Sequence, residues 1–270
     1  MLQDCIKAAA SSKSQCLNFK DEYMLTKSTI KLVQSLQDKK HRKEQSLFVA
    51  EGEKIVSEVL GSKIKVKTLF ATSLWLQNNA INVHKTIECI VVDEKQMKQL
   101  SAQPSPPQVL VVCMIEQVEL PLKIKGTTQL LDTIKDTGNM GTIIRNADWY
   151  GITRIICSEN SADVYNPKVI QASMGSFTRV ALCYTRISDF IKRHAAIPVY
   201  GAMLQGKSLY DVSLKPDCMI LIGNEGNGIS KELIPLITNP ICIPKRGGAE
   251  SLNAAIAAAI ICDTWARSVS

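Results

Sequence analysis

Apolar and polar positions along the chain follow two different periods, which together predict two blocks of alternating strands and helices. In the first block Ile30, Val33 and Leu36 recur at helical spacing, which predicts an amphipathic helix. Short apolar runs rich in β-branched residues predict strands. The predicted strands cover 47–50, 66–71 and 89–92, and a second helix covers 51–60. The first block is therefore predicted to be a small α/β domain.

A Pro-rich segment, QPSPP at 103–107, ends this block and is typical of a linker. The apolar run at 109–115 follows it and could still pair with the first sheet. We expect a variable extension or misassigned start, a first domain, a linker with a possible strand, and a second domain. Their ranges are 1–23, 24–105, 106–127 and 128–270.

The second block alternates apolar runs with helical patterns, which predicts a mainly parallel sheet. Asn166 and Pro167 mark one helix start, because asparagine is a good N-cap and proline suits the first helical position. The sequence LQGK at 204–207 is expected to form a turn. The predicted strands cover 129–131, 154–157, 180–184, 199–203, 219–222 and 241–243.

A helix predicted over 140–150 has one apolar face and one polar face. Arg145 lies off the apolar face, so its guanidinium is free to face solvent or a substrate. Gly151 is well placed to end the helix. The apolar face consists of Met140, Ile143, Ile144 and Ala147.

Two glycine-rich loops follow strands in the last part of the chain. The sequence GNEGNG at 223–228 follows one strand, and Gly247 and Gly248 follow the next. Ligands bind at the carboxyl ends of strands in open α/β sheets, so the two loops predict a pocket for a small polar cofactor. Taken alone, the first loop is equally well interpreted as a tight turn. Its glycine order, G-x-x-G-x-G, differs from the dinucleotide-binding order G-x-G-x-x-G.

An Ala-rich helix is predicted to start near Ser251. Its apolar face is expected to contain Leu252, Ile256, Ala259 and Ile260. Ser251 is a good helix N-cap, and without further context that is its more common role.

Composition excludes several other classes of protein. The chain is 46% hydrophobic, which suits a globular core, and it has no run of about 18 apolar residues that would span a membrane. The nine cysteines are scattered without a C-x-x-C pair, and no signal-peptide segment is present. We therefore expect a cytoplasmic protein with reduced thiols. His41, His84 and His194 form no ligand pattern, so no metal site is expected.

The charge is basic and unevenly distributed. The formal net charge is +7, and residues 1–110 hold 16 basic and 11 acidic residues, which places +5 there. A basic chain fits a polyanionic partner. Lys39, Lys40, Arg42 and Lys43 form a run after the first amphipathic helix. Such a run is more often a solvated helix end, whereas its functional interpretation is contact with RNA phosphates.

Three stretches, at 139–146, 222–230 and 243–257, resemble the signature motifs of the SpoU/TrmH-type RNA ribose 2′-O-methyltransferases of the SPOUT superfamily. The resemblance covers roughly residues 24–270. It implies a ribosomal-protein-like N-terminal domain that binds RNA and a methyltransferase domain with a trefoil knot from about residue 199 onward. It also implies a homodimer with active sites near the subunit interface, and ribosomal RNA as a better expectation than transfer RNA.

The resemblance further implies S-adenosylmethionine (SAM) as the cofactor and assigns residues to it. Gly223, Ile243 and Leu252 match SAM contacts made largely through backbone groups, and Met203 and Gly226 wall the adenosine. Backbone donors and acceptors suit the edges of adenine, which fits a pocket lined by glycines.

The expected catalytic residues are Asn139, Arg145, Glu225, Ser251 and Asn253. Arg145 matches the residue often assigned as the base, but a guanidinium is effectively always protonated, so a phosphate clamp is physically easier. Asn139 and Glu225 could orient the loop or the hydroxyl. Ser251 and Asn253 could bind a neighbouring phosphate or Arg145 itself.

Alternative functions differ in what they require of these residues. A non-catalytic RNA-binding protein with the same fold would not need the polar set that this chain retains. A tRNA 2′-O-methyltransferase would use the same site on another RNA. A nucleotide-dependent oxidoreductase would need the other glycine order.

Overall fold

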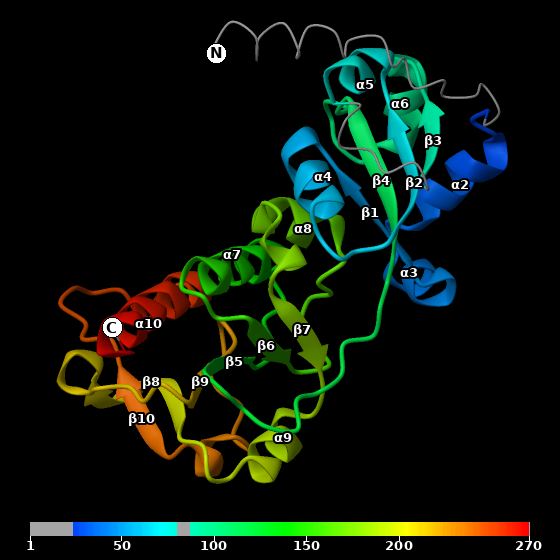
Figure 1. The fold of residues 1–270 in the computed structure, drawn as a ribbon. Helices are drawn as coiled ribbons and strands as arrows, with labels where there is room; N and C mark the ends of the chain where they lie inside the picture. The colour runs from blue at the N-terminus through cyan, green and yellow to red at the C-terminus, as the bar shows by residue number, and fades with distance from the viewer. Residues whose placement is uncertain (1–23, 80–86, 270) are drawn as a thin grey trace, which may run out of the picture.

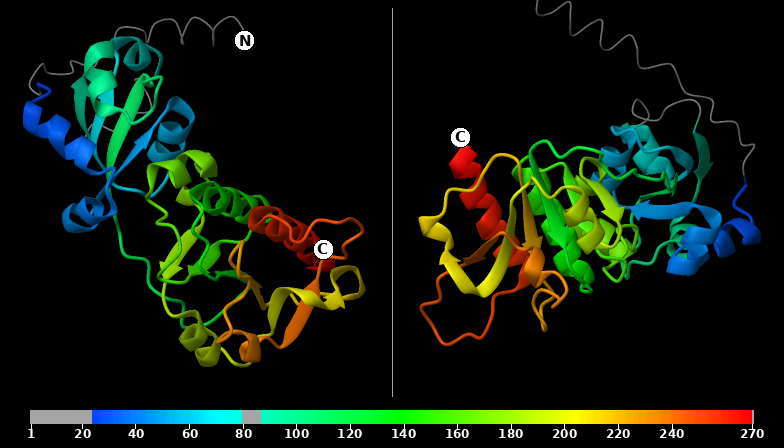
Figure 2. Two further views of the ribbon diagram at one scale, coloured as in Figure 1. Left: turned by 180° about the vertical axis from the view of Figure 1, so that it is seen from behind. Right: turned by 90° about the horizontal axis from the view of Figure 1, so that it is seen from below.

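A computed structural model of the chain describes residues 24–79 and 87–269, so the extension expected over 1–23 lies outside the described residues. The molecule contains two sheets, each in its own domain, and the two domains are in contact (Figures 1 and 2). The first sheet has the strand order β1-β4-β2-β3, and the second has the order β10-β8-β9-β5-β6-β7. No helix in the described ranges is long and apolar enough to cross a membrane.

The first domain is the predicted small α/β unit. β4 lies between β1 and β2 and is antiparallel to both, so the apolar run after the Pro-rich segment pairs with the first sheet. Residues 115–126 therefore connect the two sheets. The strands are β1 (Leu47–Glu51), β2 (Val66–Ala71), β3 (Glu88–Val91) and β4 (Val109–Met114). The helices are α2 (Lys27–Ser35), α3 (Lys39–Gln45), α4 (Glu53–Leu60), α5 (Ser73–Asn79) and α6 (Glu94–Leu100).

The basic run forms its own helix rather than the end of the preceding one. α2 ends at Ser35, and the Asp38 side chain accepts a hydrogen bond from Lys40 N, which caps the start of α3. An aspartate N-cap satisfies a backbone donor that no helix carbonyl reaches. The basic run is therefore not the solvated end of the first amphipathic helix.

The second domain contains a six-stranded sheet in which every described pairing is parallel, which confirms the predicted parallel sheet. β5 and β9 are buried along their whole length, as expected for strands covered on both faces. The strands are β5 (Thr127–Leu131), β6 (Arg154–Cys157), β7 (Ala181–Tyr184), β8 (Val199–Ser208), β9 (Cys218–Ile222) and β10 (Asn239–Cys242). The helices are α7 (Thr137–Trp149), α8 (Pro167–Ser173), α9 (Ile187–Arg193) and α10 (Ala254–Val269).

The turn expected at 204–207 is absent, because β8 continues to Ser208. Gly201 pairs with Pro240, and the next paired residue of β8 is Lys207, opposite Ile241. The intervening residues bulge away from β10 before the strand returns. Gly206 permits the return, since a Cβ there would lie 2.8 Å from the carbonyl carbon of Pro240. The knot implied by the resemblance stays a prediction.

Helix α10 faces the core with the side opposite to the predicted one. Leu252 and Ile256 are 49% and 51% exposed, whereas a set of smaller side chains is buried. Alanine side chains allow a helix to approach its neighbours closely, and α10 packs on α7. The buried set is Ala254, Ala255, Ala258, Ile261 and Cys262.

Candidate active site

The first glycine loop is a closed turn at the end of β9. Asn224 and Gly228 exchange two backbone hydrogen bonds of 2.9 and 3.0 Å. The Asn224 side-chain oxygen accepts bonds from Gly226 N at 2.9 Å and Asn227 N at 3.2 Å. A Cβ on Gly223 would lie 2.3 Å from the carbonyl carbon of Gly228, so glycine is required for this closure.

The same loop is tied to the loop that follows β5, the neighbouring strand. Asn224 Nδ2 donates to the carbonyl of Thr133 at 2.8 Å, and Ser230 N donates to the buried Asp132 carboxylate at 2.7 Å. Thr133 itself adopts a positive φ of 58°, a conformation that costs energy for a β-branched residue. These contacts fix the two loops relative to each other at one edge of the sheet.

Residues from all three motifs form one chain of hydrogen bonds. Asn253 Nδ2 donates to Asn139 Oδ1 at 2.8 Å, and Asn139 Nδ2 donates to Glu225 Oε1 at 2.7 Å. Asn253 precedes α10, Asn139 lies in the first turn of α7, and Glu225 lies in the glycine loop. The structure thus brings together three of the five residues that the sequence predicts to be catalytic. Their individual roles stay predictions.

Arg145 and Ser251 are the other two predicted catalytic residues, and both are exposed. Arg145 lies on α7 away from the buried Met140, Ile143 and Ile144, as the helical pattern predicts. Within the described part of the chain its guanidinium makes no hydrogen bond or ion pair. The side chain is therefore free to bind a ligand. Ser251 does not cap α10, so the interpretation of this serine as the helix N-cap is wrong.

Asn253 is the residue that caps this helix. Its side-chain oxygen accepts hydrogen bonds from Ala255 N at 2.9 Å and Ile256 N at 3.2 Å. Both serine and asparagine are good N-caps. The cap uses the Asn253 oxygen, which leaves its amide nitrogen to donate to Asn139.

Three of the predicted cofactor residues belong to the adjacent parallel strands β10, β8 and β9 or follow them directly. Gly223 follows β9 and Ile243 follows β10, whereas Met203 lies within β8, two residues beyond its last pairing with β9. All three are half-buried, whereas Gly226 and Leu252 are exposed. The half-buried Met203 and Ile243 both pack against core residues and can form apolar walls.

The segment at 244–252, directly after Ile243, has backbone groups that are free to bind a ligand. Its backbone makes no hydrogen bond with any residue in the described ranges, and Cβ atoms on Gly247 or Gly248 would meet open space. A nucleoside needs apolar walls together with free backbone donors and acceptors. The residues at this edge therefore fit SAM.

Two buried cysteines of the second domain, Cys218 at the start of β9 and Cys262 on α10, do not supply thiol chemistry. Burial raises the pKa of the Cys218 thiol to about 11 and that of Cys262 to about 12. Both thiols stay protonated near neutral pH, and a protonated thiol is a poor nucleophile. Within residues 24–79 and 87–269, no group of three His, Cys, Asp or Glu residues could hold a metal ion.

The predicted phosphate-binding run separates into two kinds of residue. Lys39, Lys40 and Lys43 are exposed on α3, whereas Arg42 is only 2% exposed. Arg42 bonds to Asp163 of the second domain through Nε at 3.1 Å and Nη2 at 2.7 Å. The prediction that Arg42 contacts RNA is therefore wrong. Successive residues of a helix point in different directions, so one member of a short charged run can face inward.

Sequence reasoning also missed Asp132 and Asn224, which hold the two loops together. Both are polar residues placed directly after or near the end of a predicted strand. That position is the signal that could have identified them.

Comparison with known proteins identifies the class. A model of the SpoU rRNA methylase family matches residues 127–263, and a model of the MRM3-like substrate binding domain matches residues 27–111. The 23S rRNA (guanosine(2553)-2′-O)-methyltransferase RlmP of Bacillus subtilis is 29% identical over 229 residues, which are 84% of this chain and 91% of that protein.

Solved structures agree over nearly the whole chain. A TrmH-family structure from Porphyromonas gingivalis has a TM-score of 0.84 and 38% identity, and covers 91% of this chain and 99% of that one. The SpoU methyltransferase AviRb of Streptomyces viridochromogenes, in complex with AdoMet, has a TM-score of 0.80 and 27% identity. That match covers 90% of this chain and 98% of AviRb.

The chain belongs to the SpoU rRNA methylase family. It is an S-adenosylmethionine-dependent RNA methyltransferase with the SPOUT fold, which confirms the family, cofactor and enzyme class that the three motifs predict.

Proposed function

We propose that this enzyme transfers the methyl group of SAM to a ribose 2′-hydroxyl in ribosomal RNA. The observation that carries the proposal is the hydrogen-bonded chain Asn253–Asn139–Glu225. Its middle residue, Asn139, lies on the same helix, α7, as Arg145, whose guanidinium pairs with no described residue. The 2′-O-methyltransferase activity of the Bacillus subtilis relative towards 23S rRNA supports the choice of reaction and RNA.

The proposed residue roles follow from charge and hydrogen bonding. When bound, SAM supplies an electrophilic methyl group, and the protein must hold the hydroxyl in line with it. A guanidinium is a charged hydrogen-bond donor and a poor base, so Arg145 binds a phosphate of the target nucleotide and fixes the ribose. Asn139 and Glu225 hold the glycine loop in place. Ser251 is exposed and lies two residues before Asn253, so it is available to bind a neighbouring phosphate.

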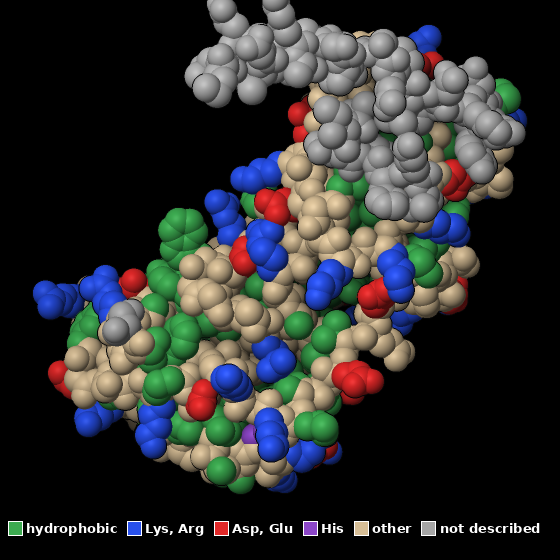
Figure 3. All heavy atoms as spheres, in the orientation of Figure 1, with side chains coloured by type: hydrophobic (Ala, Val, Ile, Leu, Met, Phe, Trp, Pro, Cys, Tyr) green, Lys and Arg blue, Asp and Glu red, His purple; other side chains and the backbone are tan. Residues whose placement is uncertain are grey.

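RNA binding is proposed for the outer face of α3. Lys39, Lys40 and Lys43 project from it, and the first domain matches a substrate-binding domain. In the view of Figure 3, lysine and arginine side chains are spread over both domains rather than gathered on one. The RNA is therefore expected to contact both domains.

The exposed side of α10 supports a homodimer. Ile256 is 51% exposed and Tyr210 is 66% exposed, and Tyr210 lines one hollow together with Ala259 and Ile260 of the helix. Large exposed apolar groups in one place are typical of protein interfaces. Light scattering of Ile256→Asp tests this: the variant should be monomeric, and an unchanged mass would exclude this face as the dimer interface.

We expect the enzyme in the cytoplasm, where the ribosomal RNA of bacteria is found.

The function is tested by methylation of total RNA from a strain that lacks the gene, with radiolabelled SAM and subsequent mapping of the modified ribose. Label at a ribose of ribosomal RNA supports the proposal. Label in transfer RNA instead would favour the tRNA alternative. SAM binding by calorimetry without any transfer to either RNA would favour a non-catalytic RNA-binding protein.

A further inference from the structure

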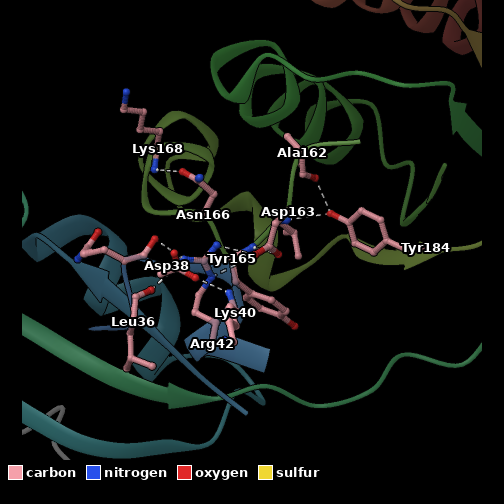
Figure 4. A network of polar contacts seen from close by, with 12 residues as sticks. Leu36, Asp38, Lys40, Arg42, Ala162, Asp163, Tyr165, Asn166, Lys168 and Tyr184 are labelled. Carbon is pink, nitrogen blue, oxygen red and sulfur yellow. Dashed lines mark hydrogen bonds and ion pairs between the residues drawn. The ribbon is translucent and has the colours of Figure 1, made fainter. Parts of the chain in front are cut away.

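A buried ion pair joins the two domains and has no part in the proposed chemistry. Arg42 of α3 bonds to Asp163, which lies in the loop between β6 and α8. Arg42 Nη1 also donates to the carbonyls of Leu36 and Gln37, each at 2.8 Å. Figure 4 shows Arg42 reaching from the first domain to this loop. One guanidinium thus binds the end of α2 and the second domain at once.

The loop that carries Asp163 is itself held in place. Tyr165 N donates to Asp163 Oδ1 at 3.1 Å, which leaves Oδ2 for Arg42. On the other side, the Tyr184 hydroxyl donates to the Ala162 carbonyl at 2.7 Å and accepts from Val164 N at 2.8 Å (Figure 4). The acceptor for Arg42 therefore has a fixed position on the sheet of the second domain.

A second ionic contact joins the domains on α7. Arg179 pairs with Glu58 of α4 and donates to Asp148 Oδ2 at 2.8 Å. Asp148 lies three residues after Arg145 on the same helix. At this contact Gly175 is also required, because a Cβ there would lie 2.5 Å from Glu58 Cγ.

Apolar and backbone contacts fill the space around these ion pairs. The ring of Phe48 on β1 lies 4.5 Å from that of Tyr165 and 6.1 Å from that of Phe177. Gln171 Nε2 of α8 donates to the carbonyl of Glu51 at 2.8 Å. Phe48 and Ala50 of β1 share one continuous hydrophobic core with the buried apolar residues of α7. A hinge between the domains would have to expose this core and break a buried charge pair.

We propose that Arg42 and Asp163 are positioning residues that fix the distance between α3 and Arg145, and thereby select which ribose is methylated. The inference rests on the proposed function. α3 carries the three exposed lysines on its outer face and Arg42 on its inner face, so the residue that fixes the helix lies among those expected to bind RNA. If the distance between the α3 lysines and Arg145 is fixed, an RNA that contacts both places only one ribose next to the methyl group of SAM. Correct orientation of the reacting groups accounts for much of the rate of such a transfer.

The test compares Asp163→Asn with the wild-type enzyme on long structured RNA and on a fragment that contains the mapped ribose but is too short to reach α3. Asparagine keeps the size of the side chain and removes its charge. A misplaced substrate can cost about a hundredfold in rate, so we expect a fall of that order in kcat/KM on the long RNA. On the short fragment the two enzymes should be equal, and their SAM affinities should match. Methylation of neighbouring riboses on the long RNA is also expected.

Glu232→Gln is the matched control, because it removes one charge from the exposed pair of Arg186 and Glu232 within the second domain. It should behave as the wild type on both RNAs. Equal kcat/KM and an unchanged methylation site for Asp163→Asn on the long RNA would overturn the proposal. So would an equal loss on both RNAs, which indicates a purely structural role.

Small-angle X-ray scattering gives a readout that does not depend on transfer. Asp163→Asn should show a larger radius of gyration than the wild type, and superimposable curves would count against the proposal even if the wild-type enzyme methylated no RNA. If Asp163→Asn does not fold, Glu58→Gln removes the exposed second contact and is measured in the same way, with a smaller loss on the long RNA expected.

Discussion

Arg42 and Arg145 both lie on helices and have opposite surroundings in the structure. Arg42 is buried in the domain junction, where it donates to two carbonyls and one carboxylate. Arg145 is exposed at the candidate active site, and no described residue pairs with it. A guanidinium whose donors are already bound holds a structure together, whereas one with free donors can bind a substrate. The difference separates residues that fix the site from residues that act in it.

The strongest way to test this contrast is Arg42→Ala. Removing one partner of a buried ion pair costs about 3–5 kcal/mol, because the other charge is left without compensation. We expect a loss of that size in the free energy of unfolding, measured by urea denaturation. Lys40→Ala, two residues away and exposed, should change stability by no more than about 0.5 kcal/mol. Equal effects of the two substitutions would show that the burial of Arg42 contributes little.

Arg145→Ala should have the reverse pattern. We expect a loss of about 3 kcal/mol or more in transition-state stabilisation, with SAM affinity and stability unchanged, since the side chain makes no contact in the described structure. Single-turnover rates on cognate RNA and calorimetry with SAM measure the two quantities. Arg145→Lys refines the role: rescue indicates that charge suffices, and no rescue indicates that the planar fork is needed. A near wild-type rate for Arg145→Ala would refute the assignment.

The comparison is sharpened by a variant that keeps Arg42 and replaces the three exposed lysines of the basic run. Each phosphate contact contributes about −0.7 to −0.9 to the slope of log K against log salt. Replacing Lys39, Lys40 and Lys43 with alanine should therefore flatten the slope by roughly two units. Filter binding of RNA at several salt concentrations measures it. An unchanged slope would mean that the lysines form only a solvated helix face.

The smallest effect is expected from pH at the second interdomain contact. Partial burial raises the pKa of the Asp148 carboxyl, but hydrogen bonds from Arg179 and Ser176 and the charge of Arg179 lower it below its ordinary value of 3.8. A carboxyl with a lowered folded-state pKa stabilises the fold above its ordinary pKa, and the contribution is lost as pH falls through the folded value. Asp148→Asn should lower the melting temperature at pH 7. The difference from wild type should shrink below pH 3.8, and a constant difference would argue against this linkage.

Most strands were predictable from the sequence, because a short apolar run is local information. The strands at 66–71 and 154–157 match their predictions to the residue. The burial of Arg42 was not predictable, because its partner Asp163 lies 121 residues away. The continuation of β8 past 203 depends on pairing with β10, which is also remote in sequence.

The last helix shows a different limit of sequence patterns. α10 is apolar on more than one side, so the pattern alone does not say which side meets the core. The small side chains of Ala254, Ala255 and Ala258 pack inward, and Ile256 stays outside. In the site, the motifs predicted Asn139, Glu225 and Asn253 as candidate residues. The hydrogen bonds between them could not be predicted, because they join residues 114 and 86 positions apart in sequence.

The place of β4 has a consequence for how the protein is made. The strand between β1 and β2 is the last one of the first sheet to be synthesised, so this sheet cannot close until residue 114 has left the ribosome. A fragment that ends at the Pro-rich segment would leave β1 and β2 as two unpaired edges. Open edges of this kind invite pairing with other chains, so such a fragment is expected to aggregate, whereas one extended through Met114 can complete its sheet.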